Sequence, residues 1–263
     1  MKLPKTTTDM DSKKYIGLIP ARYGSSRFPG KPLAMLGGKT VIRRVYEQVL
    51  KSLDEAYVCT DDQRIFDHVL GFGGKAVMTS EDCKSGTDRC WQAYERLGKE
   101  ADVVVNIQGD EPFVQPSQLE LLKSCFDDAT TQIATLVKPF LPTDGIESLT
   151  NPNSPKVVVD NSMRAIYFSR SVIPYVRGQE MQEWMSRHTF YRHIGLYAYR
   201  ADVLRRITSL PQGTLEQCES LEQLRWIENG YTIRVGVTDV ETIGIDTPGD
   251  LQRAEKYLKT LKD

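Results

Sequence analysis

The sequence predicts an α/β protein with a mostly parallel central sheet flanked by helices and a smaller β-rich subdomain. Two observations carry this prediction. Between residues 15 and 138, short apolar runs alternate with stretches of helical periodicity, which is typical of parallel strands joined by helices that cover both faces of a sheet. After residue 139 the alternation stops, and the sequence becomes rich first in turn residues and then in Tyr, Val and Ile.

The first half of the chain contains most of the predicted sheet. An apolar run starts at Tyr15 and breaks at Pro20, and the run DVVVNI at residues 102–107 is the clearest buried strand. The other expected elements, in chain order, are a helix over 39–53, a strand over 56–59, a helix over 65–72 closed by two glycines, a strand over 76–78, a helix over 87–97, a helix over 119–126 and a strand over 133–137.

The second half is predicted to hold the subdomain and the end of the fold. Four prolines break up residues 139–155. The expected elements after them are strands of a different layer over 156–160, 165–169 and 193–199, a loop over 174–190, a helix over 214–228, a strand over 232–237 and a helix over 248–261 with Pro248 in its first turn. We expect a flexible extension (1–14) and a single domain (15–263), made of a core (15–138), an insertion over the ligand edge (about 139–195) and a closing segment (about 196–263).

Composition excludes several classes of protein. The chain has 263 residues and a net charge of −1, whereas a nucleic-acid-binding protein usually shows strong basicity. Its five cysteines form no C-x-x-C pair, so a disulfide scaffold is not expected and a reducing cytoplasm is. No apolar run reaches the ~20 residues that span a bilayer, and the polar N-terminus lacks the apolar stretch of a secretory signal.

Three cations lie close together in the stretch that follows the first predicted strand. Arg22, Arg27 and Lys31 stand among glycines, serines and prolines in residues 20–32, which we call the basic loop. Small residues let backbone N–H groups approach an anion, and Arg and Lys side chains bind phosphate oxygens. The loop matches neither GxxxxGK[ST] nor GxGxxG. A solvated surface loop is the alternative, and we expect a phosphate-binding loop of another kind.

Two aspartates are candidate ligands of a divalent cation. Asp110 follows the strand at 102–107 and lies close to Gln108, whose amide suits a base or a sugar, and Asp246 precedes the last helix. If both lie at the carboxyl edge of the sheet, their carboxylates can share one Mg²⁺ with substrate phosphates. The alternatives are that Asp110 caps a turn and that Asp246 only begins a helix.

Other polar residues have both a functional and a structural interpretation. Ser85 stands at the head of a predicted helix, where it can contact an anion or cap the helix. Arg192 and His193 are adjacent, with Tyr197 in the same segment and Arg170 after the strand at 165–169. Arg and His together suit a ligand that carries a carboxylate. A lone His in a strand is, however, more often a structural residue.

One pair of polar residues is placed by helical periodicity. Glu219 and Gln223 are four residues apart within the helix predicted over 214–228, so they are expected to share one of its faces. Such a face can hold the hydroxyls of a sugar. The alternative is an acidic face that contacts only solvent.

Taken together, these pieces closely resemble the 3-deoxy-manno-octulosonate cytidylyltransferases, or CMP-Kdo synthetases. The resemblance runs from about Tyr15 to the last helix. It is carried by IPARYGSSRFPGKP (19–32), CTDD (59–62), SGTDR (85–89), NIQGDEP (106–112), NPNSPKVV (151–158), YFSR (167–170), YRHIGLYAY (191–199), LEQCESLEQLR (215–225) and IGIDTP (243–248).

The resemblance implies a nucleotide-diphospho-sugar transferase fold related to the GT-A type, usually a homodimer, in which the insertion also serves dimerisation. It implies the Mg²⁺-dependent reaction of CTP with 3-deoxy-D-manno-octulosonate (Kdo) to give CMP-Kdo and diphosphate, a step of lipopolysaccharide biosynthesis. By position, it implies Arg22, Lys31, Ser25 and Arg27 at the triphosphate, with Pro20, Ala21, Ser85 and Gln108 at the nucleotide, Asp110 and Asp246 at the metal, and Arg170, His193, Tyr197, Glu219 and Gln223 at or near the sugar.

Two stretches depart from the family pattern, and rival functions stay open. The first 13 or so residues extend beyond the usual start, and residues 174–190 match little. A cytidylyltransferase for 8-amino-Kdo or sialic acid is the close rival. A GT-A glycosyltransferase would be expected to carry Asp-x-Asp where this chain has Gln-Gly-Asp-Glu-Pro. A non-catalytic nucleotide sensor would be expected to lack the aspartates or the cations, which are all present.

Overall fold

The computed structural model describes residues 13–240 and 243–260, so the extension expected at 1–14 lies almost wholly outside the described residues. Within them, a central mixed sheet follows the strand order β11-β7-β10-β6-β1-β4-β5. The strands of this path are β1 (Tyr15–Pro20), β4 (Ala56–Thr60), β5 (Ala76–Met78), β6 (Val103–Asn106), β7 (Ile133–Pro139), β10 (Tyr191–Arg200) and β11 (Ile233–Val237).

Most neighbouring strands of this path are parallel. β1 lies between β4 and β6 and is parallel to both, and β5 and β11 also pair in parallel with their neighbours. β10 is the exception, because it runs antiparallel between β6 and β7 and carries a bulge between Ile194 and Tyr197. The predicted fold class is confirmed. A separate two-stranded hairpin, β2 (Met35–Leu36) with β3 (Lys39–Thr40), follows the basic loop.

Helices cover both faces of the sheet, and the two faces have separate cores. On one face, apolar side chains of α1, α2 and α4 pack on the strands, and on the other those of α3, α7 and α9 do so. Burial on both faces explains why strands such as DVVVNI read as continuous apolar runs. The helices are α1 (Val41–Val49), α2 (Gln63–Gly71), α3 (Gly86–Leu97), α4 (Pro116–Ser124), α5 (Gly145–Thr150), α6 (Trp184–Arg187), α7 (Ala201–Thr208), α8 (Thr214–Glu219), α9 (Gln223–Glu228) and α10 (Pro248–Thr260).

The strands expected in a different layer belong instead to the central sheet, so that expectation was wrong. β8 (Lys156–Val159) pairs with β10 and with β9 (Ala165–Ser169). β10 starts at Tyr191 rather than at residue 193, since it begins among these strands and continues into the core. Because β10 is long, it pairs with β8 at its start and with β6 further on, and so joins β8 and β9 to the central sheet.

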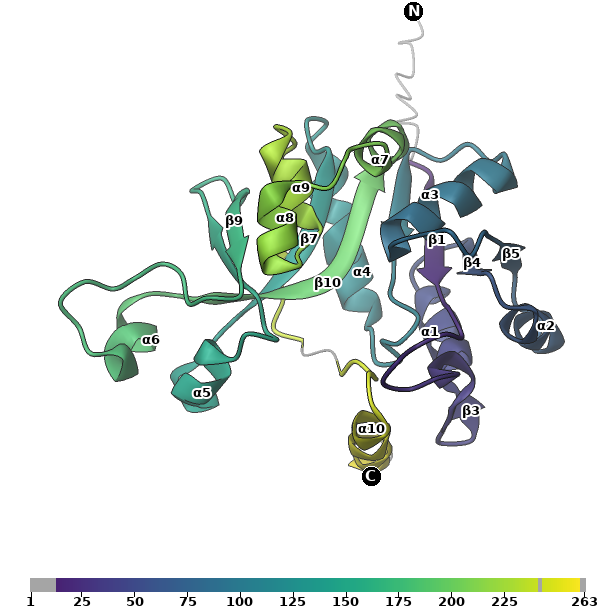
Figure 1. Cartoon of the computed structure of the whole chain (residues 1–263), viewed down its shortest axis with the longest axis horizontal. Coiled ribbons are helices and arrows are strands. Elements are labelled where there is room, and N and C mark those ends of the chain that lie inside the picture. Colours follow the sequence, from purple (N-terminus) through teal and green to yellow (C-terminus); the bar gives the residue numbers. More distant parts are fainter. Residues whose placement is uncertain (1–12, 241–242, 261–263) are drawn as a thin grey trace, which may run out of the picture.

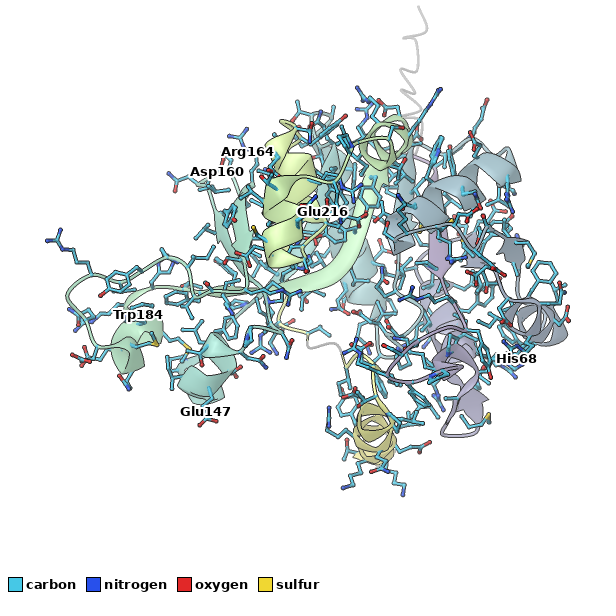
Figure 2. All side chains as sticks on the ribbon, in the orientation of Figure 1. His68, Glu147, Asp160, Arg164, Trp184 and Glu216 are labelled. Atoms are coloured by element: carbon cyan, nitrogen blue, oxygen red, sulfur yellow. The ribbon has the colours of Figure 1, made fainter. Side chains whose placement is uncertain are left out.

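Residues 140–190 form a lobe in which β8 and β9 extend the sheet and the remaining segments project from it. In Figure 1, α5, α6 and β9 extend to one side, away from α1, α2 and α3. The lobe has its own apolar cluster, in which Phe140, Leu149, Trp184 and Phe190 are buried. Figure 2 shows Trp184 and Glu147 within the lobe, apart from Glu216 on α8. The polar and aromatic loop expected over 174–190 therefore includes a short helix that contributes to a packed cluster.

The single helix expected over 214–228 is two helices. The backbone at Ser220 takes a left-handed conformation with φ 50°, which ends α8, and α9 begins at Gln223. Left-handed geometry is uncommon for a residue other than glycine. The expectation that Glu219 and Gln223 share one face of a continuous helix was wrong, because the break re-orients the second segment. Among the described residues no helix has the length and apolar character needed to cross a membrane.

Candidate active site

A cleft of about 310 Å³ opens at the carboxyl ends of β1 and β6. The cleft is lined by the basic loop, the head of α3, the turn after β6 and Asp246. In open α/β sheets this edge is the usual place for a ligand. The residues predicted for nucleotide and metal all line the cleft, namely Pro20, Ala21, Arg22, Ser25, Arg27, Lys31, Ser85, Gln108, Asp110 and Asp246.

The basic loop folds back on itself and so brings its last cation into the cleft. Gly30 has φ 71°, and its N–H donates to the carbonyl of Tyr23 at 2.9 Å. A Cβ atom at Gly30 would lie 3.0 Å from the Tyr23 ring, so glycine meets both the backbone and the packing requirement. Ser25 Oγ accepts from the N–H of Phe28 at 3.3 Å. The chain then turns through the short 3-10 helix η1 (Lys31–Leu33).

Lys31 contacts both candidate metal ligands. Its Nζ donates to Asp110 Oδ2 in a short contact and to Asp246 Oδ1 at 3.0 Å. Arg27 Nη2 lies 3.2 Å from the same oxygen of Asp246. Burial opposes the charge of Lys31, but the two carboxylates outweigh burial and raise the pKa of its ammonium. The structure thus brings together two residues that are far apart in the sequence, although only Asp110 follows a strand and Asp246 lies between β11 and α10.

The chemistry of this pair fits a magnesium ion. Two hard carboxylate oxygens that converge on one ammonium can converge on a metal cation, and Mg²⁺ is usually bound by one or two carboxylates together with phosphates and water. The described part of the chain holds no group of three or more His, Cys, Asp or Glu side chains suited to a metal. The remaining ligands would therefore come from substrate and water.

The turn that carries Asp110 packs tightly against β1. A Cβ atom at Gly109 would lie 2.7 Å from the carbonyl oxygen of Pro20, so only glycine allows this approach. Gln108 Nε2 donates to Asn106 Oδ1 at 3.2 Å, and a Cβ atom at Gly86 would lie 3.5 Å from the same nitrogen. The amide of Gln108 is therefore held between β6 and the head of α3.

Ser85 caps α3, which confirms the structural alternative for this residue. Its Oγ accepts from the N–H of Asp88 at 3.1 Å. The same side chain also lines the cleft, so capping does not remove it from the site. Two residues later, Thr87 Oγ1 donates to Glu222 Oε2 at 2.6 Å and ties α3 to the segment between α8 and α9.

Two charged residues of the site were missed in the sequence reasoning. Arg89 lines the cleft with a buried guanidinium that donates to Asp61 Oδ2 at 2.6 Å and to Thr79 Oγ1 at 2.5 Å. Glu111, next to Asp110, has a buried Oε2 without a hydrogen-bond partner. Burial first, and then Asp110 and Asp246, raise the pKa of Glu111 to about 8. The motifs SGTDR and QGDEP contain both residues, but sequence does not reveal which side chains are buried.

The residues expected at the sugar do not line this cleft and form two neighbouring groups. In the first, Glu219 accepts from Ser169 Oγ at 2.6 Å and from the N–H of Arg170 at 2.9 Å. The guanidinium of Arg170 donates to the carbonyls of Glu219, Pro152 and Ser220 at 2.5, 2.9 and 3.2 Å. Arg170 therefore holds the end of α8 against the lobe.

The second group lies on β10 and the start of α9. The rings of His193 and Tyr197 are 5.3 Å apart, and Nε2 of His193 is hydrogen-bonded to Thr135 Oγ1 at 3.0 Å. Burial lowers the pKa of His193 to about 4, so this imidazole is neutral at pH 7. Gln223 is buried, and its Nε2 has no hydrogen-bond partner. A buried amide donor without a partner is costly and marks a place where a ligand can accept.

Comparisons with known proteins agree with this geometry. A cytidylyltransferase family model matches residues 16–235. The chain is 69% identical over 246 residues to the 3-deoxy-manno-octulosonate cytidylyltransferase of Phocaeicola vulgatus, covering 94% of this chain and 98% of that protein. The chain belongs to the 3-deoxy-manno-octulosonate cytidylyltransferase family. The protein of that name from Bacteroides thetaiotaomicron is 65% identical, again over 94% of this chain and 98% of the relative.

Solved structures support the same assignment. A CMP:2-keto-3-deoxy-manno-octonic acid synthetase complexed with CTP has a TM-score of 0.86 and 41% identity, over 94% of this chain and 99% of that one. HddC from Yersinia pseudotuberculosis, complexed with GMP-PN, has a TM-score of 0.65 over 93% of this chain and 99% of that one, and at 14% identity shows the fold alone. The resemblance found in the sequence is confirmed, and the chain is a nucleotidyltransferase.

Proposed function

We propose that this cytidylyltransferase transfers CMP from CTP to Kdo and releases diphosphate, with Mg²⁺ as its cofactor, for lipopolysaccharide biosynthesis. The observation that carries the proposal is the convergence of Asp110 and Asp246 on Lys31 beside the basic loop. Phosphoryl transfer needs mainly positioning and neutralisation of charge, and this cleft supplies cations for phosphates and carboxylates for a metal. The CTP complex of the 41% identical synthetase supports the choice of nucleotide.

The basic loop and the head of α3 would bind the nucleotide. Arg22 and Lys31, with Ser25 and Arg27, would contact the triphosphate, because Arg binds phosphate oxygens through two parallel hydrogen bonds and Lys adds a point charge. The cytidine would lie against Pro20, Ala21, Ser85 and Gln108, all of which line the same cleft.

Asp110 and Asp246 would hold the Mg²⁺. When bound, the ion would neutralise phosphate charge and lower the pKa of the attacking hydroxyl. Arg22 and Lys31 would stabilise the negative charge that grows on the departing diphosphate. The metal held by the two aspartates and the two cations would thereby all act on the negative charge of the phosphates.

The sugar acid would bind where β10 adjoins β6. Tyr197 is in register with Asn106, and β6 leads directly to Gln108 and Asp110. The unpartnered Nε2 of Gln223 supplies a buried donor on the same side, next to Glu222, which is bonded to α3. With Arg170, His193 and Glu219 completing the sugar site, the Kdo hydroxyl would attack the α-phosphorus as the bond to diphosphate breaks.

We further propose that the enzyme acts as a homodimer in the cytoplasm. Large apolar side chains are exposed on and beside the lobe, including Leu141, Ile166 and Tyr175, with 51, 57 and 74% of their surface accessible. Exposed apolar side chains of this size are candidates for contact with a protein partner. Sedimentation equilibrium of the purified protein tests the dimer, and a monomer at micromolar concentration would reject it.

One assay tests the reaction. The purified protein is given CTP and Mg²⁺ with Kdo, 8-amino-Kdo or sialic acid in separate reactions, and diphosphate release is followed. We expect release with Kdo and formation of CMP-Kdo. If diphosphate is released only with another acid, that acid is the substrate in place of Kdo. If none of the three acids gives release, the cytidylyltransferase proposal is rejected.

A further inference from the structure

The Lys31 ammonium occupies the space between two carboxylates that the proposed reaction requires for a metal. It contacts Asp110 Oδ2 and Asp246 Oδ1, and only 15% of its side chain is exposed, against 25% and 50% for the two aspartates. Two carboxylates this close repel each other unless a cation lies between them. In this structure the cation is the side chain of Lys31, with Arg27 as a second, more exposed partner of Asp246.

The basic loop explains how one lysine can serve both the carboxylates and a phosphate. Lys31 starts η1 directly after the left-handed Gly30, so its backbone is fixed by the turn. The ammonium lies at the end of four rotatable side-chain bonds and binds as a point charge without fixed direction. It lines the cleft together with Arg22 and Ser25, so a phosphate in that cleft competes with the carboxylates for the same donor.

We propose that Lys31 is a stand-in cation that holds Asp110 and Asp246 together in the free enzyme and transfers to the phosphates when nucleotide and metal bind. This inference rests on the proposed function. A metal that binds without nucleotide must displace the ammonium of Lys31 from the two carboxylates, and this displacement weakens metal binding. Binding of nucleotide withdraws the ammonium and frees the carboxylates. Metal and nucleotide therefore increase each other's affinity, as reciprocal coupling requires.

The test measures metal binding without any nucleotide. Mn²⁺ is titrated into the wild-type protein and into Lys31→Met, and free Mn²⁺ is followed by electron paramagnetic resonance. Removal of the competing ammonium is expected to tighten Mn²⁺ binding by about tenfold, which corresponds to one modest ion-pair contribution. The gain should disappear in Lys31→Met/Asp246→Asn, because that variant also lacks a ligand.

A second measurement follows the other half of the exchange. In the presence of EDTA, Lys31→Met should bind CTP about tenfold more weakly than the wild type in calorimetric titration, since a phosphate contact is lost. Lys39→Met is the matched control, because Lys39 pairs with Glu47 at 2.6 Å outside the cleft. Both affinities of that variant should equal those of the wild type. Circular dichroism checks that each variant is folded, and Lys31→Gln repeats the test.

The outcomes separate this inference from the proposed function. Tighter Mn²⁺ binding with weaker CTP binding supports the stand-in cation. Unchanged, weaker or undetectable Mn²⁺ binding in Lys31→Met and Lys31→Gln overturns it, even when the wild-type enzyme forms CMP-Kdo normally. Failure of the wild type to form CMP-Kdo with Mg²⁺ rejects the proposed function instead, and that result does not depend on any variant.

Discussion

The guanidinium of Arg89, which lines the cleft, donates to Asp61 Oδ2 at 2.6 Å. Only 5% of the Arg89 side chain and 16% of the Asp61 side chain are exposed. The pair joins α3 to the turn that follows β4, and Thr79 after β5 accepts from the same guanidinium. One buried cation at the cleft thus holds the head of α3 to two neighbouring segments.

Loss of this cation should destabilise the protein and weaken nucleotide binding. Arg89→Met leaves the Asp61 carboxylate partly buried without its partner, and such a change typically costs about 3 kcal/mol in the free energy of unfolding. Denaturant unfolding measures the loss. The double variant Arg89→Met/Asp61→Asn should recover part of it, because no unpaired charge is left. Equal stability of the single and double variants would contradict this account.

Loss of either candidate metal ligand should abolish turnover without loss of the fold. Asp110→Asn keeps the size of the side chain but removes the charge, and we expect kcat/KM for CMP-Kdo formation to fall at least about 100-fold. Circular dichroism and thermal melting should show a folded protein. Asp110 is partly exposed at the cleft, so no large packing change accompanies the substitution. Near-normal turnover would remove Asp110 from the proposed metal site.

Removal of a loop cation should act mainly through the triphosphate. Arg22→Ala is expected to lower kcat/KM for CTP by about 10- to 100-fold, as one charged contact to a transferring phosphate is lost. Arg43→Ala is the control, since Arg43 pairs with Glu47 on the surface of α1, and its kinetics should be those of the wild type. Steady-state kinetics with varied CTP decide between a phosphate role and a merely solvated arginine.

The partly buried His193 should make stability fall in mild acid. Its pKa is about 4 in the folded protein and close to 6.5 when unfolded, so unfolding takes up a proton between these values. The contribution of the neutral imidazole is therefore complete above pH 6.5 and is lost progressively toward pH 4. It amounts to about 3 kcal/mol by linkage.

Denaturant unfolding of wild type and His193→Asn at pH 7, 6 and 5 measures this slope. The variant should be less stable at pH 7, because the contacts with Thr135 and Tyr197 change, but its stability should depend less on pH. An identical pH dependence in both proteins would show that His193 is not the group that titrates.

Local patterns in the sequence predicted most elements because burial on both faces of a sheet leaves a continuous signal. The strands Ala76–Met78 and Ala165–Ser169 have the predicted bounds. The two aspartates meet as predicted, although Asp246 does not follow a strand. The break at Ser220 was not predictable, since a left-handed serine carries no local signal. Arg89 and Glu111 were missed because burial of a charge depends on tertiary packing.

The pairing of β8 with β10 was also beyond local reasoning. The strands beyond residue 139 were recognised from their composition, but their sheet partners depend on contacts between distant segments. Likewise, the bonds of the Arg170 guanidinium to three backbone carbonyls could not be predicted from the sequence. A sequence shows which side chain can donate, and only the fold shows where the donors are used.

The two ends of the lobe lie side by side on the sheet. Pro139, the last residue of β7, is in register with Tyr191, the first residue of β10, so residues 140–190 begin and end side by side. Segments with adjacent ends are the ones that tolerate exchange between proteins. A graft of this stretch between family members would exchange the outer part of the enzyme, provided that its contacts with the core, the pairing of β8 with β10 and the bonds of Ser169 and Arg170 to Glu219, are kept.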